Sequence, residues 1–279
     1  MLIFRQIIEV KLFLAELQQQ KRTIGFVPTM GALHQGHISL IEVSKQQCDV
    51  TVCSIFVNPT QFNNSEDLTR YPRTPEVDIQ LLKDSGCDVL YMPDVNDIYP
   101  EPDTRQFDFG YLDTILEAEH RPGHYNGVGQ VVSILLEGIK PHKAFFGSKD
   151  YQQVMIIKSL VKQLNLEVEI ISCPILREND GLAMSSRNTL LTADERKTAS
   201  LIPIMMQKAK ELAIEYGLDK AKLFVSTEIS KVSMMKLDYY EVCDAETLKP
   251  IVSLNHNQKA ISLIAVFVGK IRLIDNLMI

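Results

Sequence analysis

Short apolar runs alternate with longer segments of helical periodicity through the first 175 residues or so of the chain. This alternation is typical of βαβ units that feed one mostly parallel sheet, so we predict an α/β fold. Open sheets of this kind bind ligands at the carboxyl ends of their strands. The predicted strands are residues 23–28, 50–57, 87–92, 143–147 and 167–172.

Helical patterns fill the segments between these strands. Thr74 followed by Pro75 is typical of an N-cap with proline at the first helical position, and predicts a helix over 75–85. Apolar residues recur at helical spacing over 149–164, and a further apolar helix is expected at 131–139.

The character of the sequence changes after Pro174. A turn at 178–181 is followed by a capping box, Thr192 to Glu195, which predicts one long helix to about Tyr216. A helix near 219–231 and strands at 237–243, 260–268 and 271–275 complete a small α+β unit. We therefore predict two domains: a Rossmann-like, doubly wound parallel sheet in 1–175, and a smaller α+β lid domain in 176–279.

The composition narrows the class of protein. A chain of 279 residues suits two domains, and its net charge of −6 argues against an extended nucleic-acid contact, although not against ATP. The five cysteines form no C-x-x-C pair and lie in apolar runs, so we interpret them as reduced core residues. Charged residues interrupt the apolar N-terminus, so neither a signal peptide nor a membrane span is expected, and we predict a cytoplasmic protein.

The most informative segment, 25–38, runs from an apolar strand into a turn with two histidines that opens a helix. The N–H groups at a helix start attract phosphate, and His34 and His37 can both reach phosphates bound there. Gly36, between them, permits a close approach of the ligand. The H-x-G-H pattern is shared by a superfamily that makes or breaks nucleotidyl bonds, so by itself it names no substrate.

Three other segments carry candidate chemistry. In 58–62, Gln61 can hold a small polar substrate by its amide, although the segment also reads as an ordinary surface turn. Lys149, at a strand-to-helix junction, can neutralise phosphate charge or simply form a solvated pair with Asp150. The segment 182–188 is suited to gripping a triphosphate, or else is a polar linker.

The glycine-rich loop 121–129 is open to two interpretations. It precedes an apolar helix, so it can gate the predicted site or merely connect two elements. We interpret His124 as a structural loop residue rather than a catalyst.

Six motifs together resemble the pantothenate synthetase family, and they occur in the family's order. They are P-T-M-G-x-L-H-x-G-H at 28–37, N-P-T-Q-F at 58–62, Y-P-R-T at 71–74, R-P-G-H-Y-x-G-V at 121–128, G-S-K-D-Y-Q-Q at 147–153 and M-S-S-R-N at 184–188. The resemblance implies ATP-dependent condensation of pantoate with β-alanine. It further implies an enzyme-bound pantoyl adenylate and the release of pyrophosphate and then AMP.

The resemblance also implies roles for individual residues. His37, His34 and Lys149 would be catalytic, stabilising the charge that builds on the phosphates as pyrophosphate departs. Gln61 and Gln153 would bind pantoate. The implied ATP site comprises Met30, His34, His37, Gly147, Ser148, Lys149, Asp150, Leu176, Met184, Ser185, Ser186 and Arg187.

Two positions depart from the pattern of many relatives. Ser148 stands where a glutamate is common, and Val77 replaces the first residue of an acidic pair, which leaves Asp78. Mg²⁺ is still expected on the ATP phosphates, which supply most of its ligands, with Asp78 as at most one contact.

The resemblance implies a homodimer built on the N-terminal domains, with 50–57 contributing. Two rival functions stay open from the residues alone. One is another nucleotidylyltransferase of the same fold, acting on a phosphorylated alcohol. The other is a non-enzymatic ATP sensor that uses its C-terminal domain to bind a protein partner.

Overall fold

The computed structural model describes residues 1–255 and 258–279, and the chain divides into two compact units. The first comprises Met1–Ser148 and Gln152–Pro174, and the second comprises Lys149–Tyr151 and Ile175–Ile279. The strands of the first unit are β1 (Leu2–Phe4), β2 (Ile24–Thr29), β3 (Val50–Ile55), β4 (Val89–Tyr91), β5 (Lys143–Gly147) and β6 (Glu169–Cys173). Its main helices are α1 (Ile7–Gln19), α2 (Gln35–Gln47), α4 (Pro75–Asp84), α7 (His124–Ile139) and α8 (Tyr151–Gln163), with α8 beginning in the second unit.

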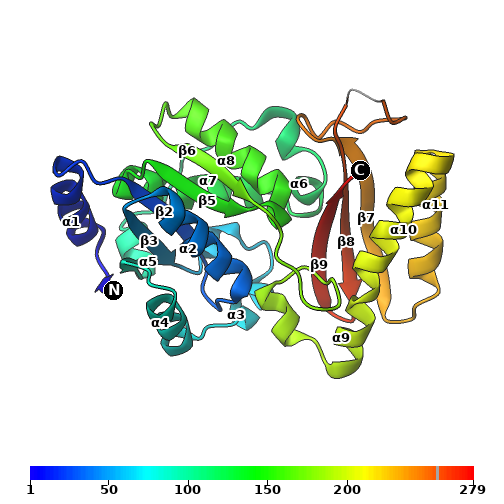
Figure 1. Cartoon of the computed structure of the whole chain (residues 1–279), viewed down its shortest axis with the longest axis horizontal. Helices are drawn as coiled ribbons and strands as arrows, with labels where there is room; N and C mark the ends of the chain where they lie inside the picture. The colour runs from blue at the N-terminus through cyan, green and yellow to red at the C-terminus, as the bar shows by residue number, and fades with distance from the viewer. Residues whose placement is uncertain (256–257) are drawn as a thin grey trace. The chain divides into compact units, whose positions relative to one another are not determined.

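The six strands of the first unit form one parallel sheet in the order β1-β4-β3-β2-β5-β6 (Figure 1). The chain winds outward from β2 through β3 to β4, then returns to add β5 and β6 on the other side of β2. The direction of winding therefore changes between β2 and β5. Ligands of such sheets bind outside the carboxyl ends of the strands at this switch point. The predicted doubly wound sheet is confirmed.

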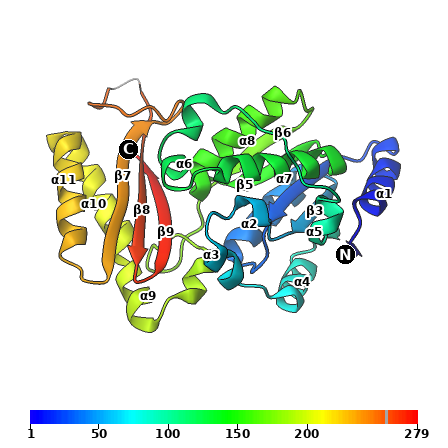
Figure 2. The ribbon, with the colours of Figure 1, turned by 180° about the vertical axis from the view of Figure 1, so that it is seen from behind.

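Apolar side chains project from both faces of the sheet, because successive residues of a strand point to opposite faces. In β2, Phe26 belongs to the core under α1, α7 and α8, whereas its neighbour Val27 belongs to the core under α2 and α4. Both side chains are fully buried. Figure 1 looks onto the face that α2 covers, and Figure 2, from behind, onto the face that α7 covers.

The second unit has its own core. Its strands β7 (Met235–Asp244), β8 (Ala260–Val268) and β9 (Ile271–Met278) form an antiparallel sheet in that order. The helices α10 (Leu201–Tyr216) and α11 (Leu218–Ser230) pack together and against β9 and β7 (Figure 1). The remaining short elements of the chain are α3 (Ser65–Arg70), α5 (Val95–Ile98), α6 (Glu117–His120), α9 (Ala193–Ala199) and 3₁₀ turns at Pro59–Gln61, Gly110–Asp113, Ser148–Asp150 and Ser186–Leu190.

Three predicted elements need correction. The long helix that was expected to reach Tyr216 is broken into α9 and α10. Pro203 explains the break, because it has no N–H to donate to Ala199 and its ring would clash with that carbonyl. The helix expected from 149 begins at Tyr151, after a 3₁₀ turn, and the one expected from 131 already begins at His124.

The cysteines and the apolar character of the helices were also considered in the sequence. All five cysteines are free thiols, and four are buried. Burial raises the pKa of each, to about 12 for Cys87 and Cys243, so none is an activated thiolate at neutral pH. Within 1–255 and 258–279, no helix is long and apolar enough to cross a bilayer.

Candidate functional site

The two histidines of the first motif cap the helix that they open. His34 is the N-cap of α2, and its Nδ1 accepts the Gly36 N–H at 3.1 Å. In return, His37 Nδ1 accepts the His34 N–H at 3.3 Å, and the two ring centroids lie 4.1 Å apart. A neutral imidazole that accepts at Nδ1 carries its proton at Nε2. Each ring is therefore a donor at Nε2, at the positive end of the α2 dipole.

The loop before His34 is held by a buried carboxylate on α4. Asp78, 1 % exposed, accepts the Ala32 N–H at 2.9 Å and the Leu33 N–H at 2.8 Å, and Thr74 Oγ1 donates to it at 3.1 Å. Ala32 has a φ of +48°, a left-handed conformation that is unfavourable for a residue with a Cβ. Two charge-assisted hydrogen bonds stabilise this conformation and so fix the approach to the histidines.

Gln61 lies in the 3₁₀ turn that follows β3, and its amide is held in a buried network. Asn58 Nδ2 donates to Gln61 Oε1 at 3.1 Å and to the Gly127 carbonyl at 3.0 Å. Gln61 Nε2 then points to Met30 Sδ, 3.0 Å away. The structure therefore brings together Gln61 and Met30, two of the residues predicted for the site. Asn58 lies in a motif quoted from the sequence, but its supporting role was not predicted.

His124 is the first residue of α7 rather than a loop residue, and its ring contacts the Gln61 turn. It is buried, and its Nδ1 lies 2.8 Å from the Gln61 carbonyl oxygen. Gly127, one turn along α7, allows the helix to approach, since a Cβ there would lie 2.4 Å from the Thr60 carbonyl oxygen. The loop 121–129 is thus the start of a helix that buttresses the Gln61 turn.

Gln152 and Gln153 are neighbours on α8, but their side chains differ in burial. Gln152 is buried, and its amide bridges the Leu112 and Ile115 carbonyls and the Glu117 N–H at 2.7–3.1 Å. It is structural. Gln153, the predicted ligand, is half-buried.

The second unit contains the predicted lysine. Lys149 Nζ lies 3.2 Å from Asp150 Oδ2, with the lysine side chain 20 % exposed. The segment is tied to distant parts of the same unit. Asn276 Nδ2 of β9 donates to the Lys149 carbonyl at 2.9 Å, and Tyr151 Oη donates to the carbonyl of Ala245, just after β7, at 2.7 Å. The segment Lys149–Tyr151 is therefore held by contacts that span 127 and 94 positions of the sequence.

The other predicted phosphate residues lie on a neighbouring turn of this unit. Ser185 caps the 3₁₀ turn Ser186–Leu190, and its Oγ accepts the Arg187 N–H at 3.3 Å. The Met184 N–H donates to the Leu176 carbonyl at 3.0 Å, which joins two residues predicted for the ATP site. Leu176 is 39 % exposed and Ser186 is buried.

One ion pair links these two segments, and it was not predicted. Arg177 forms a bidentate pair with Asp275, at 2.7 and 3.0 Å, and also donates to the Asn276 carbonyl at 3.1 Å. The Asp275 side chain is only 2 % exposed. Because Asn276 holds Lys149, this pair connects the lysine segment with the hairpin that leads to Ser185. Its partners lie 98 residues apart in sequence, so no local pattern reveals the pair.

The described ranges, 1–255 and 258–279, contain no group of three or more His, Cys, Asp or Glu residues arranged to hold a metal ion. Both Asp78 oxygens already accept protein hydrogen bonds. This arrangement does not fit an all-protein Mg²⁺ site with Asp78 as a direct ligand.

Comparison with known proteins gives consistent results. The family model for pantoate-beta-alanine ligase matches residues 2–278. Pantothenate synthetase from Porphyromonas gingivalis is 45 % identical over 275 residues, covering 99 % of this chain and 98 % of the relative. The one from Flavobacterium psychrophilum is 46 % identical over 279 residues, covering 99 % of both chains.

Solved structures agree over the whole chain. Pantothenate synthetase from Thermus thermophilus superposes with a TM-score of 0.92 at 36 % identity, covering 99 % of each chain. The pantoate-beta-alanine ligase from Francisella tularensis, solved as a complex with "Beta-gamma ATP and Beta-alanine", has a TM-score of 0.82 at 38 % identity. That match covers 100 % of this chain and 97 % of the other.

Proposed function

The chain belongs to the pantoate–β-alanine ligase (pantothenate synthetase) family, whose members condense pantoate with β-alanine using ATP, and we propose that it does so through a pantoyl adenylate. The observation that carries this proposal is the pair of helix-capping histidines, His34 and His37, which follows β2 at the switch point of the sheet. Both rings carry a donor N–H at Nε2 in the neutral form, as phosphate binding requires.

The chemistry has two steps. In the first, a pantoate carboxylate oxygen attacks the α-phosphorus of ATP, an O–P bond forms, and the bond to the β-phosphate oxygen breaks to release pyrophosphate. In the second, the free amine of β-alanine attacks the acyl carbon, and the C–O bond to AMP breaks as the nitrogen loses a proton. Neither step needs a protein nucleophile, so catalysis rests on positioning and electrostatics.

We assign the charge stabilisation in the first step to three residues. His37 and His34 donate through Nε2–H to phosphate oxygens as negative charge moves onto pyrophosphate, and Lys149 adds a positive charge. The helix dipole of α2 acts in the same direction. Because His34 and His37 are held by the cap of α2, little reorganisation of the two rings is needed in the transition state.

The remaining assignments concern binding. Ser185, Ser186 and Arg187 are assigned to the β- and γ-phosphates, since a capping turn with two hydroxyls and a guanidinium suits them. Gly147, Ser148, Asp150, Leu176 and Met184 are assigned to the nucleoside side, with Met30 beside the histidines. Gln61 and Gln153 are assigned to pantoate. We expect Mg²⁺ to arrive on the ATP phosphates rather than in a protein cage, and no step is assigned to it.

Two further properties complete the proposal. We propose a homodimer built on the first unit, and a cytoplasmic location, where the five free thiols stay reduced. Light scattering tests the dimer, and a monomeric mass at micromolar concentration would refute it.

The function is tested by separating the half-reactions. Purified protein is mixed with ATP and Mg²⁺, pantoate is added while pyrophosphate is followed, and β-alanine is added while AMP and pantothenate are followed. Pyrophosphate release that requires pantoate, then AMP release that requires the amine, is the expected result. ATP binding without pyrophosphate release would instead favour the sensor, and a dinucleotide-like product would favour another nucleotidylyltransferase.

A further inference from the structure

The amide of Gln61 can face a ligand in only one orientation. Asn58 is 1 % exposed, and two backbone groups fix which end of its amide is which: the Gly127 carbonyl accepts from Nδ2 at 3.0 Å, and the Thr60 N–H donates to Oδ1 at 3.4 Å. A carbonyl cannot donate and a backbone N–H cannot accept, so this assignment is unambiguous. Asn58 therefore presents a donor to Gln61.

The orientation of the Asn58 amide determines the orientation of the Gln61 amide. Asn58 Nδ2 donates to Gln61 Oε1 at 3.1 Å, so Gln61 Nε2 lies on the opposite side, 3.0 Å from Met30 Sδ. A thioether is a weak acceptor and can be replaced by a better one. Gln61 thus offers N–H donors to a ligand, and the group that it recognises is an acceptor such as a hydroxyl or carboxylate oxygen.

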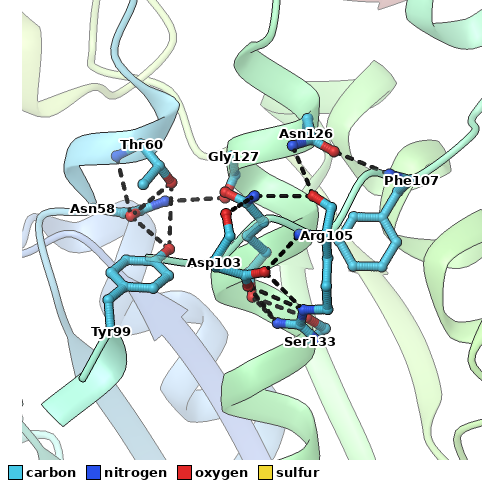
Figure 3. Close-up of polar contacts among 10 residues, drawn as sticks. Asn58, Thr60, Tyr99, Asp103, Arg105, Phe107, Asn126, Gly127 and Ser133 are labelled. Carbon is cyan, nitrogen blue, oxygen red and sulfur yellow. Dashed lines mark hydrogen bonds and ion pairs between the residues drawn. The ribbon is translucent and has the colours of Figure 1, made fainter. Parts of the chain in front are cut away.

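Tyr99 completes this arrangement from a different part of the chain. It follows α5, its ring lies against Phe56 with centroids 6.3 Å apart, and its hydroxyl donates to Asn58 Oδ1 at 2.9 Å. This is the shortest of the hydrogen bonds to that oxygen, ahead of Thr60 Oγ1 at 3.1 Å (Figure 3). Burial raises the pKa of Tyr99, so the hydroxyl keeps its proton at neutral pH.

We propose that Tyr99 is a positioning residue for pantoate, acting through Asn58 to hold the Gln61 amide with its N–H groups toward the substrate. Tyr99 does not touch the substrate itself. Its hydroxyl donates to Asn58 Oδ1 and so reinforces the position that the Gly127 carbonyl and the Thr60 N–H set for the Asn58 amide; a displaced Asn58 would donate less well to Gln61 Oε1. The inference rests on the proposed function in one respect, the assignment of Gln61 to pantoate.

Tyr99→Phe removes only the hydroxyl. One neutral hydrogen bond corresponds to about a three- to tenfold effect, so the KM for pantoate is expected to rise by that factor, while the KM for ATP stays within twofold. Tyr91→Phe is the matched control, since Tyr91 is a buried tyrosine of the same unit whose hydroxyl hydrogen-bonds Asp97, away from Gln61. A loss of general stability would affect both variants. An equal rise in the KM for pantoate in the two variants overturns the proposal.

A double-mutant cycle separates this inference from the proposed function. If Tyr99 acts through Gln61, Tyr99→Phe has no further effect on the KM for pantoate in a Gln61→Ala background. Additive effects would mean that Tyr99 acts by another route, and would overturn the proposal. If Gln61→Ala raises that KM and Tyr99→Phe does not, only the role of Tyr99 falls. If Gln61→Ala leaves it unchanged, the assignment of Gln61 to pantoate falls and the role of Tyr99 falls with it.

Discussion

The loop before α2 and the segment Lys149–Tyr151 both present predicted phosphate-binding residues, but they are held in different ways. His34 and His37 cap each other across three residues of chain, with added support from Asp78. Lys149 is held through its carbonyl by Asn276, at the far end of the sequence. The first arrangement is local and is formed largely by the helix itself. The second depends on the complete core of the second unit.

The two arrangements should respond differently to substitution. In the local arrangement, a substitution at the histidines removes chemistry while leaving most of the fold intact. In the long-range arrangement, a substitution far from the lysine in sequence loosens the support of Lys149, which we propose as a catalytic group, and destabilises its unit. Activity and stability should therefore separate at the two histidines and change together at the residues that support Lys149.

The largest effect is expected at His37. His37→Ala removes a preorganised donor, and pantoate-dependent pyrophosphate release should fall about a hundredfold or more. The melting temperature should fall only slightly, because the loss of one cap typically costs about 1 kcal/mol. Single-turnover kinetics and thermal denaturation measure the two quantities. Retained activity within a few fold would remove His37 from the mechanism.

The buried ion pair should give the largest loss of stability. Asp275→Ala leaves Arg177 without its bidentate partner, and the free energy of unfolding of the second unit should fall by about 3 kcal/mol, at the low end for a buried pair because the arginine is partly exposed. Urea denaturation measures this change. Arg196→Ala, which breaks a pair with Asp180 that is 40 % exposed, is the control and should cost under about 1 kcal/mol.

Substitution of Asp78 distinguishes a structural role of this carboxylate from a role in binding Mg²⁺. Asp78→Asn replaces an acceptor of two backbone N–H groups by an amide that satisfies only one, so the unfolding free energy should fall by about 1–3 kcal/mol and activity should fall with it. The Mg²⁺ concentration for half-maximal activity should not change. A severalfold rise in that concentration would restore Asp78 as a metal contact.

The smallest effect is expected at Asn276. Asn276→Ala removes the donor to the Lys149 carbonyl, and the KM for ATP should rise about three- to tenfold, the scale of one hydrogen bond. Ser262→Ala is a control in the same sheet, since its hydroxyl donates to the Leu277 carbonyl, away from Lys149. Equal KM values for the two variants would mean that Asn276 does not position the lysine.

These two regions also show how far the sequence can be interpreted. The parallel strands, their order of appearance and the helix opened by His34 follow from local patterns of burial and capping, and the structure confirms them. Strand β1 was missed because it has only three residues, and the start of α7 was missed because Gly127 and Gly129 weaken its helical pattern. Gly127 is required there by the close approach to Thr60, a tertiary contact.

The supporting residues of the site were the least predictable. Met30, Gln61 and Lys149 stand in motifs that can be read from the chain. Tyr99 and Asn276 are among the side chains that orient them. Tyr99 lies 38 positions from Gln61, Asn276 lies 127 positions from Lys149, and neither follows a local period. Pairing of this kind is decided by the topology of the sheet, so the structure was needed to find it.

The role of His37 is tested most directly by comparing two of its replacements in one measurement, pantoate-dependent pyrophosphate release in a single turnover. In His37→Asn, the amide oxygen can replace Nδ1 in the cap but no group reaches the position of Nε2. His37→Gln instead places an amide nitrogen near that position and gives up the cap. We expect His37→Asn to keep its melting temperature and to lose about a hundredfold in rate, the scale for one preorganised donor, and His37→Gln to retain more activity and be less stable. Wild-type rates in His37→Asn would contradict the claim that the Nε2–H of His37 stabilises the departing pyrophosphate.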